Sequence, residues 1–337
     1  MPPRRHPVSD LVSDAKIETT ILSDSIQHVF YAPGRSAQRR QEQRVENWSR
    51  ERKLGEGAFG VVYLERCQQL EGDGGACKLR AVKQIKKHIV PGQELDYTRE
   101  LEAIFKFSNP RYSHCFVRSD GWFEEGDYVF ISMEYLEHGD LQTHLVRRPL
   151  PEIEARQITT QVLEGLEYMH ENGFVHRDLK PSNIMVVSKS PEWFVKIADF
   201  GISKRRQQEG ATTTDTMNKG TLGFTAPEVF GFGSGEGDSG VSYSFAVDLW
   251  SLGAVVYLML TKTLLFPTLG DLFKYATGAT AFPAGRLKAF QVSEQAHDFV
   301  AQLMVPTAVD RPTAKSAMGH LWMTTPLIQL KGTNSDG

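Results

Sequence analysis

The chain has few cysteines, almost balanced charge and no long apolar run, and each of these features argues against a class of protein. Three cysteines occur in 337 residues and none has C-x-x-C spacing, which argues against a disulfide framework or a cysteine-rich zinc site and indicates a reducing compartment. The 38 basic and 41 acidic side chains leave a net charge of −3, which argues against non-specific binding of nucleic acid. The most apolar stretch, Leu249 to Leu260, is too short to span a bilayer.

Targeting signals are missing as well. No apolar segment follows the basic start of the chain, and neither a myristoylation glycine nor a prenylation cysteine is present. We therefore expect a cytoplasmic protein, with the nucleus as the alternative, and no membrane partner.

The first 47 residues show no sustained periodicity and are rich in polar and basic side chains, which predicts a flexible leader. Two alternatives stay open. The basic residues between Arg35 and Lys53 could form a nuclear-import patch or a docking tail instead of a solvated linker. The apolar cluster from Ile26 to Tyr31 could add a short strand or dock on the domain that follows.

Apolar periodicity predicts a strand-rich part followed by a helical part. β-branched and aromatic residues predict strands at 61–64, 79–85 and 128–133. Apolar residues spaced three to four positions apart predict a helix over 94–107. A longer helix is expected to begin near Pro151 and end at Asn172-Gly173. Further helices are expected over about 246–261, 293–304 and 313–321. This order indicates an α+β fold with a small sheet lobe and a larger, mainly helical lobe.

A glycine-rich segment opens the strand-rich part. Glycines let a backbone approach phosphate oxygens closely, and the segment from Leu54 to Val62 contains G-x-G-x-x-G-x-V. Dinucleotide-binding folds share this spacing, but their loop opens a helix, whereas residues 61–64 continue as a strand. We therefore predict a hairpin over nucleotide phosphates, with nucleotide contacts from Leu54, Gly55, Glu56, Gly57, Ala58, Phe59, Gly60 and Val62.

Lys83 lies in the predicted strand that follows the glycine-rich segment. Ala81 shares the face of Lys83, because strand side chains alternate, and its small side chain leaves room for a flat base. Glu100, in the first half of the next helix, can pair with Lys83 and hold its ammonium against the α- and β-phosphates. A solvated strand lysine is the alternative when Lys83 is considered alone.

The segment from His176 to Asn183 reads H-R-D-L-K-P-S-N and supplies groups for phosphoryl transfer. Asp178 can orient an attacking hydroxyl and accept its proton, and Lys180 can stabilise the charge of the transferring group. Asn183 offers an oxygen to Mg²⁺, and Asp199, which opens Asp-Phe-Gly after a predicted strand, is the second metal ligand.

With these motifs the sequence resembles the eukaryotic protein kinase family over about residues 50–323. The resemblance continues at Ala226-Pro227-Glu228, at Asp248-Leu249-Trp250 and at Asp310-Arg311-Pro312. In that family the matching Glu228 and Arg311 pair, and the residue matching Asp248 braces the catalytic loop. The segments 275–299 and 320–322 resemble the calcium/calmodulin-dependent-kinase-like group, although no basic amphipathic helix supports calmodulin binding.

The resemblance implies a bilobal kinase domain over 48–323, with a small lobe at 48–132, a large lobe at 137–323 and a short tail at 324–337. It implies that ATP lies between the lobes and that Mg²⁺ is held by Asn183 and Asp199. The catalytic residues implied are Asp178, Lys180, Lys83 and Glu100. Further implied nucleotide contacts, in the adenine pocket, the hinge, the ribose site and the pocket floor, are Ala81, Met133, Glu134, Leu136, Asp140 and Met185.

Lys180 and Gly220-Thr221 are similar to the serine/threonine pattern, so the expected partner is a protein substrate with serine or threonine. A phosphate on the segment Thr212-Thr213-Thr214-Asp215-Thr216 could dock on Arg177 and Lys204 and activate the enzyme, placed there by an upstream kinase or by the enzyme itself. The alternative function is a pseudokinase-like scaffold or adaptor, which would need a missing catalytic part. All five parts, Lys83, Glu100, Asp178, Asn183 and Asp199, are present.

Overall fold

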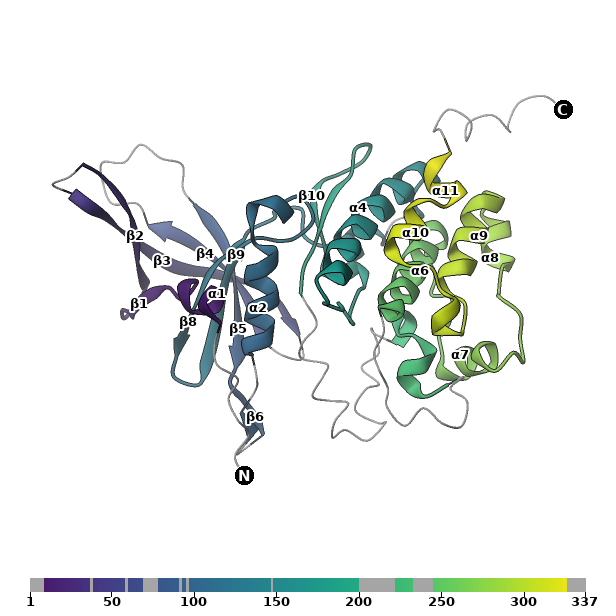
Figure 1. Ribbon diagram of the computed structural model, residues 1–337, viewed down its shortest axis with the longest axis horizontal. Coiled ribbons are helices and arrows are strands. Elements are labelled where there is room, and N and C mark those ends of the chain that lie inside the picture. The colour runs from purple at the N-terminus through teal and green to yellow at the C-terminus, as the bar shows by residue number, and fades with distance from the viewer. Residues whose placement is uncertain are drawn as a thin grey trace. The chain divides into compact units, whose positions relative to one another are not determined.

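The structure is a computed structural model, and its chain divides into two compact units (Figure 1). Unit 1 comprises Met1–Ser113 and Val117–Tyr135, and unit 2 comprises His114–Phe116 and Leu136–Gly337. The residues described are 9–36, 39–57, 60–68, 78–90, 93–94, 97–146, 148–199, 222–232 and 245–325. Within these ranges, no helix combines the length and the apolar character needed to cross a membrane.

Unit 1 is built on an antiparallel sheet whose strands follow the order β1-β2-β3-β4-β5-β9-β8. The strands are β1 (Glu18–Ile21), β2 (Ile26–Ser36), β3 (Arg39–Gly57), β4 (Gly60–Gln68), β5 (Leu79–Lys86), β8 (Ser119–Glu125) and β9 (Tyr128–Glu134). A short pair, β6 (His88–Val90) and β7 (Gln93–Glu94), lies outside this sheet. The helical elements are α1 (Asp10–Asp14), α2 (Thr98–Phe107) and the 3-10 turn η1 (Pro110–Tyr112). The predicted strands in this region are therefore confirmed as β4, β5 and β9, and the predicted helix begins at Thr98.

The structure differs from the flexible leader predicted for residues 1–47. Residues 9–36 contain α1, β1 and β2, and β2 pairs along β3 with Ile26 opposite Trp48 and His28 opposite Glu46. The apolar cluster at Ile26 thus adds a strand, which was the open alternative. Composition hides this strand because its fully buried side chain, His28, is polar, while its apolar residues Ile26, Val29 and Phe30 are only partly buried.

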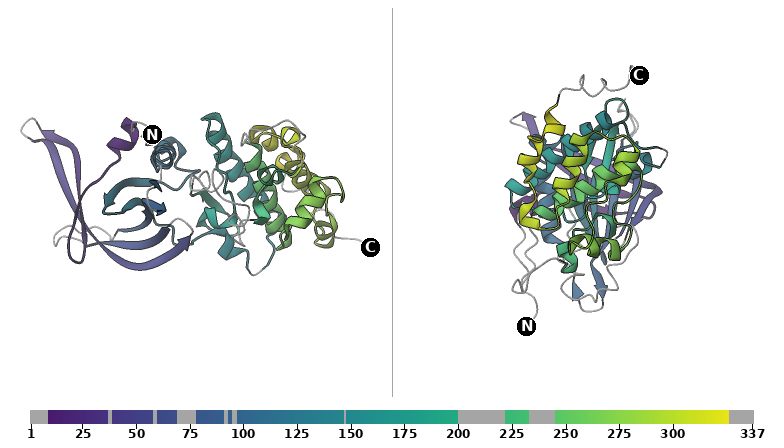
Figure 2. Two further views of the ribbon diagram at one scale, coloured as in Figure 1. Left: turned by 90° about the horizontal axis from the view of Figure 1, so that it is seen from below. Right: turned by 90° about the vertical axis from the view of Figure 1, so that its right-hand side faces the viewer.

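The N-terminal residues also link the two edge strands of this sheet. Just before β1, the amide of Ile17 donates to the carbonyl of Trp122 in β8 at 2.8 Å, and Lys16 bridges Trp122 in parallel. Because β1 itself pairs with β2 at the opposite edge, the sheet closes on itself, and the left view of Figure 2 shows how strongly its strands curve.

A buried polar network lies inside this curved sheet. The Arg80 guanidinium donates to Glu65 Oε2 from Nε at 3.0 Å and from Nη2 at 2.7 Å. The same Nη2 lies 2.8 Å from His28 Nε2, and Thr19 Oγ1 lies 2.9 Å from His28 Nδ1. Arg80 also stacks over Trp48, with its Cζ 4.1 Å from the ring centroid. These contacts pair the buried Arg80 charge with one oxygen of Glu65, while Glu65 Oε1 is buried without a hydrogen-bond partner.

Unit 2 is mainly helical and carries a two-stranded antiparallel sheet, β10 (Ile184–Ser188) with β11 (Phe194–Ile197). Its helices are α3 (Leu141–His144), α4 (Glu152–Glu171), α6 (Ala246–Thr261), α7 (Leu269–Ala276), α8 (Gly285–Ala289), α9 (Glu294–Leu303), α10 (Ala314–Met318) and α11 (Leu321–Thr324). Its 3-10 turns are η2 (Pro181–Asn183), η3 (Leu222–Phe224), η4 (Pro227–Phe230) and η5 (Ala308–Asp310). The predicted helix between Pro151 and Gly173 is confirmed as α4, and Gly173 takes a left-handed φ of 77° just past its end.

The core of unit 2 forms around α6, whose residues from Val247 to Thr261 are all buried. A helix that is apolar on every side must be surrounded by other elements, and α4 and α9 pack against it. Arg311 is anchored in the same unit, because its Nη1 and Nη2 donate to the two carboxylate oxygens of Glu228 at 2.6 and 2.7 Å. The predicted Glu228–Arg311 pair is thus confirmed, as is the predicted α+β architecture of a sheet lobe and a helical lobe.

Candidate active site

The glycine-rich segment forms the predicted hairpin in unit 1. β3 and β4 pair antiparallel up to Gly57 opposite Gly60, and Ala58 and Phe59 between them lie outside the described residues. A Cβ at Gly60 would collide with the main-chain carbonyl oxygen of Gln84 in β5, so the fold itself requires glycine there. A Cβ at Gly55 or Gly57 would meet no described atom within 4 Å, so open space lies beside the backbone at these two glycines.

The other residues predicted to contact the nucleotide here, Leu54, Glu56 and Val62, lie in β3 and β4. Leu54 is half-buried in β3, and the exposed Glu56 forms an ion pair with Lys53. Val62 in β4 lies opposite Lys83 in β5, so both side chains are on the same face of the sheet.

Ala81, Lys83 and Met133 also share this face of the sheet. Ala81 lies two residues before Lys83 and pairs with Met133 in β9. Ala81 is 9% exposed, and its side chain beside Lys83 is only a methyl group. Glu134 ends β9, and its Oε1 accepts the amide of Arg118 at 2.8 Å. The structure thus brings Val62, Ala81, Lys83 and Met133 together on one face of the sheet, with Glu134 at the end of β9.

Lys83 and Glu100 form the predicted ion pair. Lys83 Nζ lies 3.3 Å from Glu100 Oε1, with the side chains 13% and 6% exposed. Glu100 occupies the first turn of α2, so the position of that helix determines where the Lys83 ammonium is held. A nearly buried pair of this kind depends on both partners, because removing one leaves the other charge uncompensated.

In unit 2, the segment that carries Asp178 is fixed by Asp248 from α6. Asp248 is fully buried, and its two oxygens accept the amides of His176 and Arg177, each at 2.8 Å. His176 is also fully buried, with Nε2 3.1 Å from the carbonyl oxygen of Ala198. The predicted bracing of this loop by Asp248 is therefore confirmed.

Asp178, Lys180 and Asn183 come together within this loop. Lys180 Nζ donates to Asp178 Oδ2 at 2.9 Å, and Asn183 Nδ2 donates to the Asp178 carbonyl at 2.8 Å. Pro181 and Asn183 bound the turn η2, which folds the chain back so that residues two and five positions beyond Asp178 contact it. A carboxylate, a cation and an amide are thereby held in one constellation.

Asp199 follows β11 and is exposed. Its φ of 58° is left-handed, as is the φ of 64° at Arg177, and such values in non-glycine residues concentrate at functional sites. The amide of Ala198 donates to the Asn183 carbonyl at 2.9 Å, which ties the chain just before Asp199 to the loop of Asp178. Phe200 and Gly201 lie outside the described residues, as do Lys204, the threonines from Thr212 to Thr216, Gly220 and Thr221.

The remaining predicted contacts are in the first part of unit 2. Met185 lies in β10 and forms an isolated bridge with Asp140, which places these two residues side by side. Asp140 caps α3, because its Oδ1 accepts the amide and the hydroxyl of Thr143 at 2.9 and 2.8 Å. Leu136 is half-buried, and its carbonyl accepts the amide of Gly139 at 3.1 Å. The assignment of Asp140 to a ribose remains a prediction.

Sequence reasoning missed His170, whose Nε2 lies 2.9 Å from Asp248 Oδ2. Asp248 therefore has three hydrogen-bond donors, two from the main chain and one from this side chain. The ring of His170 stacks on Phe245, with centroids 4.6 Å apart. No motif points to His170, because its partner lies 78 positions further along the chain.

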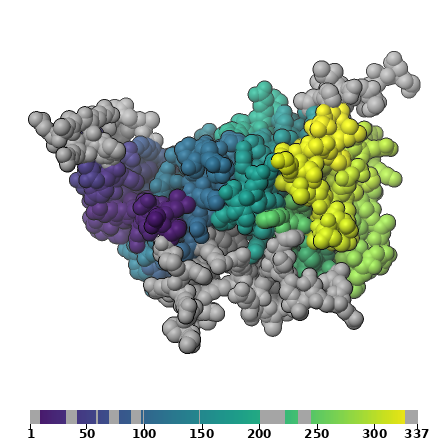
Figure 3. Space-filling view, viewed as in Figure 1, coloured from purple at the N-terminus to yellow at the C-terminus, as the bar shows by residue number. Residues whose placement is uncertain are grey.

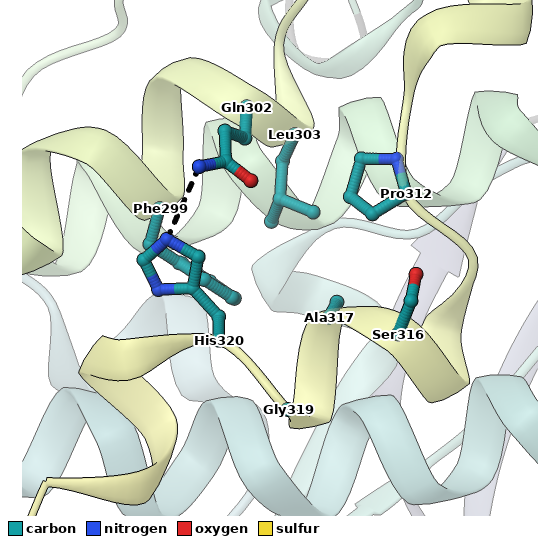
Figure 4. Close-up of a pocket in the computed structure, with 8 residues that line it drawn as sticks. All are labelled: Phe299, Gln302, Leu303, Pro312, Ser316, Ala317, Gly319 and His320. Atoms are coloured by element: carbon teal, nitrogen blue, oxygen red, sulfur yellow. Dashed lines mark hydrogen bonds between the residues drawn. The ribbon is translucent and has the colours of Figure 1, made fainter.

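Two other features of unit 2 are separate from these residues. His114, Cys115 and Glu164 bring possible metal-ligating atoms within 4.8 Å of one another, and burial raises the pKa of the Cys115 thiol to about 12. A cavity of about 320 Å³ lies between α9 and α10, and there Gln302 is hydrogen-bonded to His320 (Figure 4). The predicted site includes none of the residues that line the cavity.

Comparison with known proteins shows which family has these motifs. The family model described as the protein kinase domain matches residues 48–323. The serine/threonine-protein kinase RAD53 of Saccharomyces cerevisiae is 35% identical over 278 residues, which cover 80% of this chain and 32% of the yeast protein. A calcium/calmodulin-dependent protein kinase of Metarhizium anisopliae is 34% identical, covering 81% of this chain and 66% of that protein. The chain thus spans about a third and about two thirds of the lengths of these relatives.

Solved structures give the same result. The crystal structure of Rad53 1-466 in complex with AMP-PNP has a TM-score of 0.64 and 33% identity, covering 82% of this chain and 65% of that one. The crystal structure of the Rad53 kinase domain and SCD2 in complex with AMPPNP has a TM-score of 0.57 and 30% identity, covering 81% and 89%. With a family model over most of its length and relatives among the serine/threonine kinases, including the calcium/calmodulin-dependent type, this chain belongs to the protein kinase family.

Proposed function

We propose that this chain is a serine/threonine protein kinase that transfers the γ-phosphoryl group of ATP to a hydroxyl group of a protein, with Mg²⁺ as the metal. The observation that carries the proposal is the constellation of Asp178, Lys180 and Asn183, which the described structure holds by hydrogen bonds of 2.8–2.9 Å. Phosphoryl transfer needs positioned charges more than covalent chemistry, so preformed geometry of this kind supports it.

Each residue has a separate role in this proposal. The Asp178 carboxylate orients the substrate hydroxyl and accepts its proton, and Lys180 lies beside it, where its charge stabilises the transferring phosphoryl group. Lys83, held by Glu100, contacts the α- and β-phosphates, while the open backbone at Gly55 and Gly57 covers them.

The donor atoms of Asn183 and Asp199 suit Mg²⁺, because both offer the hard oxygen ligands that this ion prefers. The hydrogen bond from Asn183 Nδ2 to the Asp178 carbonyl supports this role, because the amide then has Oδ1 to offer to the metal. Asp199 is exposed and thus accessible to a hydrated ion. When bound, the metal would neutralise phosphate charge.

Serine or threonine as the acceptor follows from Lys180 and from the names of the relatives, which are serine/threonine and calcium/calmodulin-dependent kinases. Regulation by phosphorylation of the segment Thr212–Thr216 is part of the proposal and rests on sequence alone, since these residues lie outside the described part. Its test is mass spectrometry of the active protein combined with alanine at the four threonines. Equal activity of untreated, phosphatase-treated and alanine-substituted protein would exclude this regulation.

The central experiment measures phosphate transfer from Mg-ATP by the purified full chain to peptide libraries that differ only in serine, threonine or tyrosine. We expect transfer to serine and threonine peptides. Asp178→Asn, Lys83→Met and Asp199→Asn should each reduce turnover by at least about 100-fold, the scale for losing a proton acceptor or a preorganised charge.

Asp298→Asn is the matched control, because Asp298 is an exposed carboxylate of α9 outside the proposed site. It should retain the wild-type rate. The proposal fails if Asp178→Asn keeps more than half of the activity, or if tyrosine peptides are the preferred acceptors.

A further inference from the structure

Helix α2 of unit 1 has little intrinsic support at its beginning. Its N-cap residue is Tyr97, whose side chain makes no capping hydrogen bond, and the helix has ten residues. A helix of this length is marginal by itself in water, so its position depends on tertiary contacts. Because Glu100 lies in its first turn and pairs with Lys83, those contacts also determine the geometry of the ion pair.

Residues 9–17, which we call the N-terminal segment, supply such contacts. Helix α1 in this segment packs against α2, and Figure 1 shows the two helices next to each other. Val12, the buried residue of α1, is fully inaccessible to solvent. In Figure 3 the dark purple atoms of this segment lie against the blue atoms of the same unit.

Trp122 in β8 joins the N-terminal segment to the sheet by three hydrogen bonds. Its indole Nε1 donates to the Val12 carbonyl at 2.7 Å, and its amide donates to the Ala15 carbonyl at 3.1 Å. Its own carbonyl accepts the amide of Ile17 at 2.8 Å. Ile17 packs directly on Gly121, where a Cβ would lie 2.5 Å from Ile17 Cγ1. The contact thus uses side-chain and main-chain groups on both sides.

The same part of β8 holds the start of α2. The Tyr97 ring lies 6.1 Å from the Trp122 ring, and the Tyr97 hydroxyl donates to Glu124 Oε1 at 2.8 Å. From the other side, Lys16 Nζ lies 4.9 Å above the Trp122 ring and 4.0 Å from Glu124. Trp122 and Glu124 therefore contact both the N-terminal segment and the residue from which α2 begins.

From these contacts we propose that the N-terminal segment positions α2, and through it Glu100 opposite Lys83, for the kinase reaction proposed above. Val12 and Trp122 are the main positioning residues. They contact neither Lys83 nor Glu100 in any described interaction, and act through α2. Release of the segment would free the first turn of α2 and weaken the Lys83–Glu100 pair.

The test uses the full chain with Val12→Asp, which places an unpaired carboxylate at the buried position, and with Trp122→Phe, which keeps a ring but removes the donor to Val12. Leu11→Asp is the matched control, because Leu11 is the neighbouring residue of α1 and is 44% exposed. Amide hydrogen exchange should be faster in residues 98–107 by roughly five-fold or more for Val12→Asp, and kcat/KM for ATP should fall by a similar factor. Leu11→Asp should match the wild type in both measurements.

A double-mutant cycle separates positioning from a general loss of structure. In a Glu100→Gln background, Val12→Asp should cause little further loss of kcat/KM, since the ion pair through which it acts is already absent. The proposal would be overturned if the loss of kcat/KM in the double variant equalled the product of the losses in the two single variants. Unchanged amide exchange in residues 98–107 of Val12→Asp would also overturn it.

Exchange in β9 shows whether the variant damages the whole unit. If amide exchange in β9 is also faster in Val12→Asp, the test relies on the milder Trp122→Phe. The same exchange and kcat/KM measurements on that variant then support or overturn the proposal. If the wild type phosphorylates no peptide, the proposed function fails, and the exchange of α2 still decides whether the N-terminal segment holds this helix.

Discussion

Asp248 holds Arg177 in a left-handed backbone conformation. Its Oδ1 accepts the Arg177 amide at 2.8 Å, and Arg177 has a φ of 64°. The other oxygen accepts the amide of His176 and lies 2.9 Å from His170 Nε2, so one buried carboxylate fixes the backbone that leads directly into Asp178.

Asp248→Asn should therefore lower both stability and turnover. The amide offers one oxygen and turns an N–H₂ group toward a backbone donor, so we expect a loss of about 2–4 kcal/mol in the free energy of unfolding and a turnover reduced by about ten-fold or more. Urea denaturation and peptide phosphorylation measure the two effects. Asp298→Asn, which removes an exposed carboxylate paired with His320 at 3.1 Å in the same unit, should change the stability by less than about 1 kcal/mol. Equal stability of the two variants would contradict this account.

Removing one partner of the Glu228–Arg311 pair should destabilise the chain strongly. The Arg311 side chain is completely buried and also donates to the carbonyls of Val305, Ala246 and Pro306. Arg311→Met leaves the Glu228 carboxylate and these carbonyls without their donor, at an expected cost of about 3–5 kcal/mol. Glu228→Gln should cost less, because the carbonyl bonds of Arg311 persist. Thermal unfolding of both variants tests this order, and a larger loss in Glu228→Gln would reverse it.

Unfolding at acidic pH should depend on His28. Burial and the neighbouring Arg80 guanidinium lower the pKa of His28 from 6.5 to about 3, and the Arg80 donor at Nε2 keeps the folded ring neutral. The unfolded chain binds a proton below pH 6.5 and the folded chain does not, so stability falls as pH decreases from 6.5 toward 3. This single group should remove about 2 kcal/mol between pH 6.5 and 4.5.

The measurement is the urea-unfolding free energy across this pH range for wild type and His28→Gln. The variant is less stable at neutral pH but should lack this part of the acid-induced loss. Parallel curves for wild type and His28→Gln would show that His28 is not neutral in the folded chain.

Alanine at two helical glycines should have opposite effects on stability. At Gly253 in α6 a Cβ would lie 2.6 Å from Met304 Cγ and 3.0 Å from Leu303 Cβ. This overpacking, about 1–3 kcal/mol, should outweigh the gain of up to about 1 kcal/mol in helix propensity. At Gly270 in α7 the nearest atom is Thr268 Oγ1 at 3.7 Å, so Gly270→Ala should stabilise the chain. Thermal shifts of the same sign would contradict this packing argument.

Local patterns in the sequence were sufficient for much of the candidate site and for the helices of unit 2. The pairing of Lys83 with Glu100 came from the kinase motif pattern, since the two residues are 17 positions apart in a strand and a helix. The hairpin ending at Gly57 and Gly60 and the span of α4 follow from short-range spacing. Such features depend on strand alternation, helical periodicity and capping within a few residues, which is the information that a sequence displays directly.

Only the tertiary structure shows that residues 9–36 fold onto the sheet of unit 1. The hydrogen bond between Val12 and Trp122 joins positions 110 residues apart, and the buried His28 depends on Arg80, which lies 52 residues away. No local pattern reports such partners, and a polar composition predicts solvent exposure unless the partners are known. The segment takes its place because distant residues bury Val12, Ile17 and His28 and bind the polar ring of His28, and this depends on how the whole sheet closes.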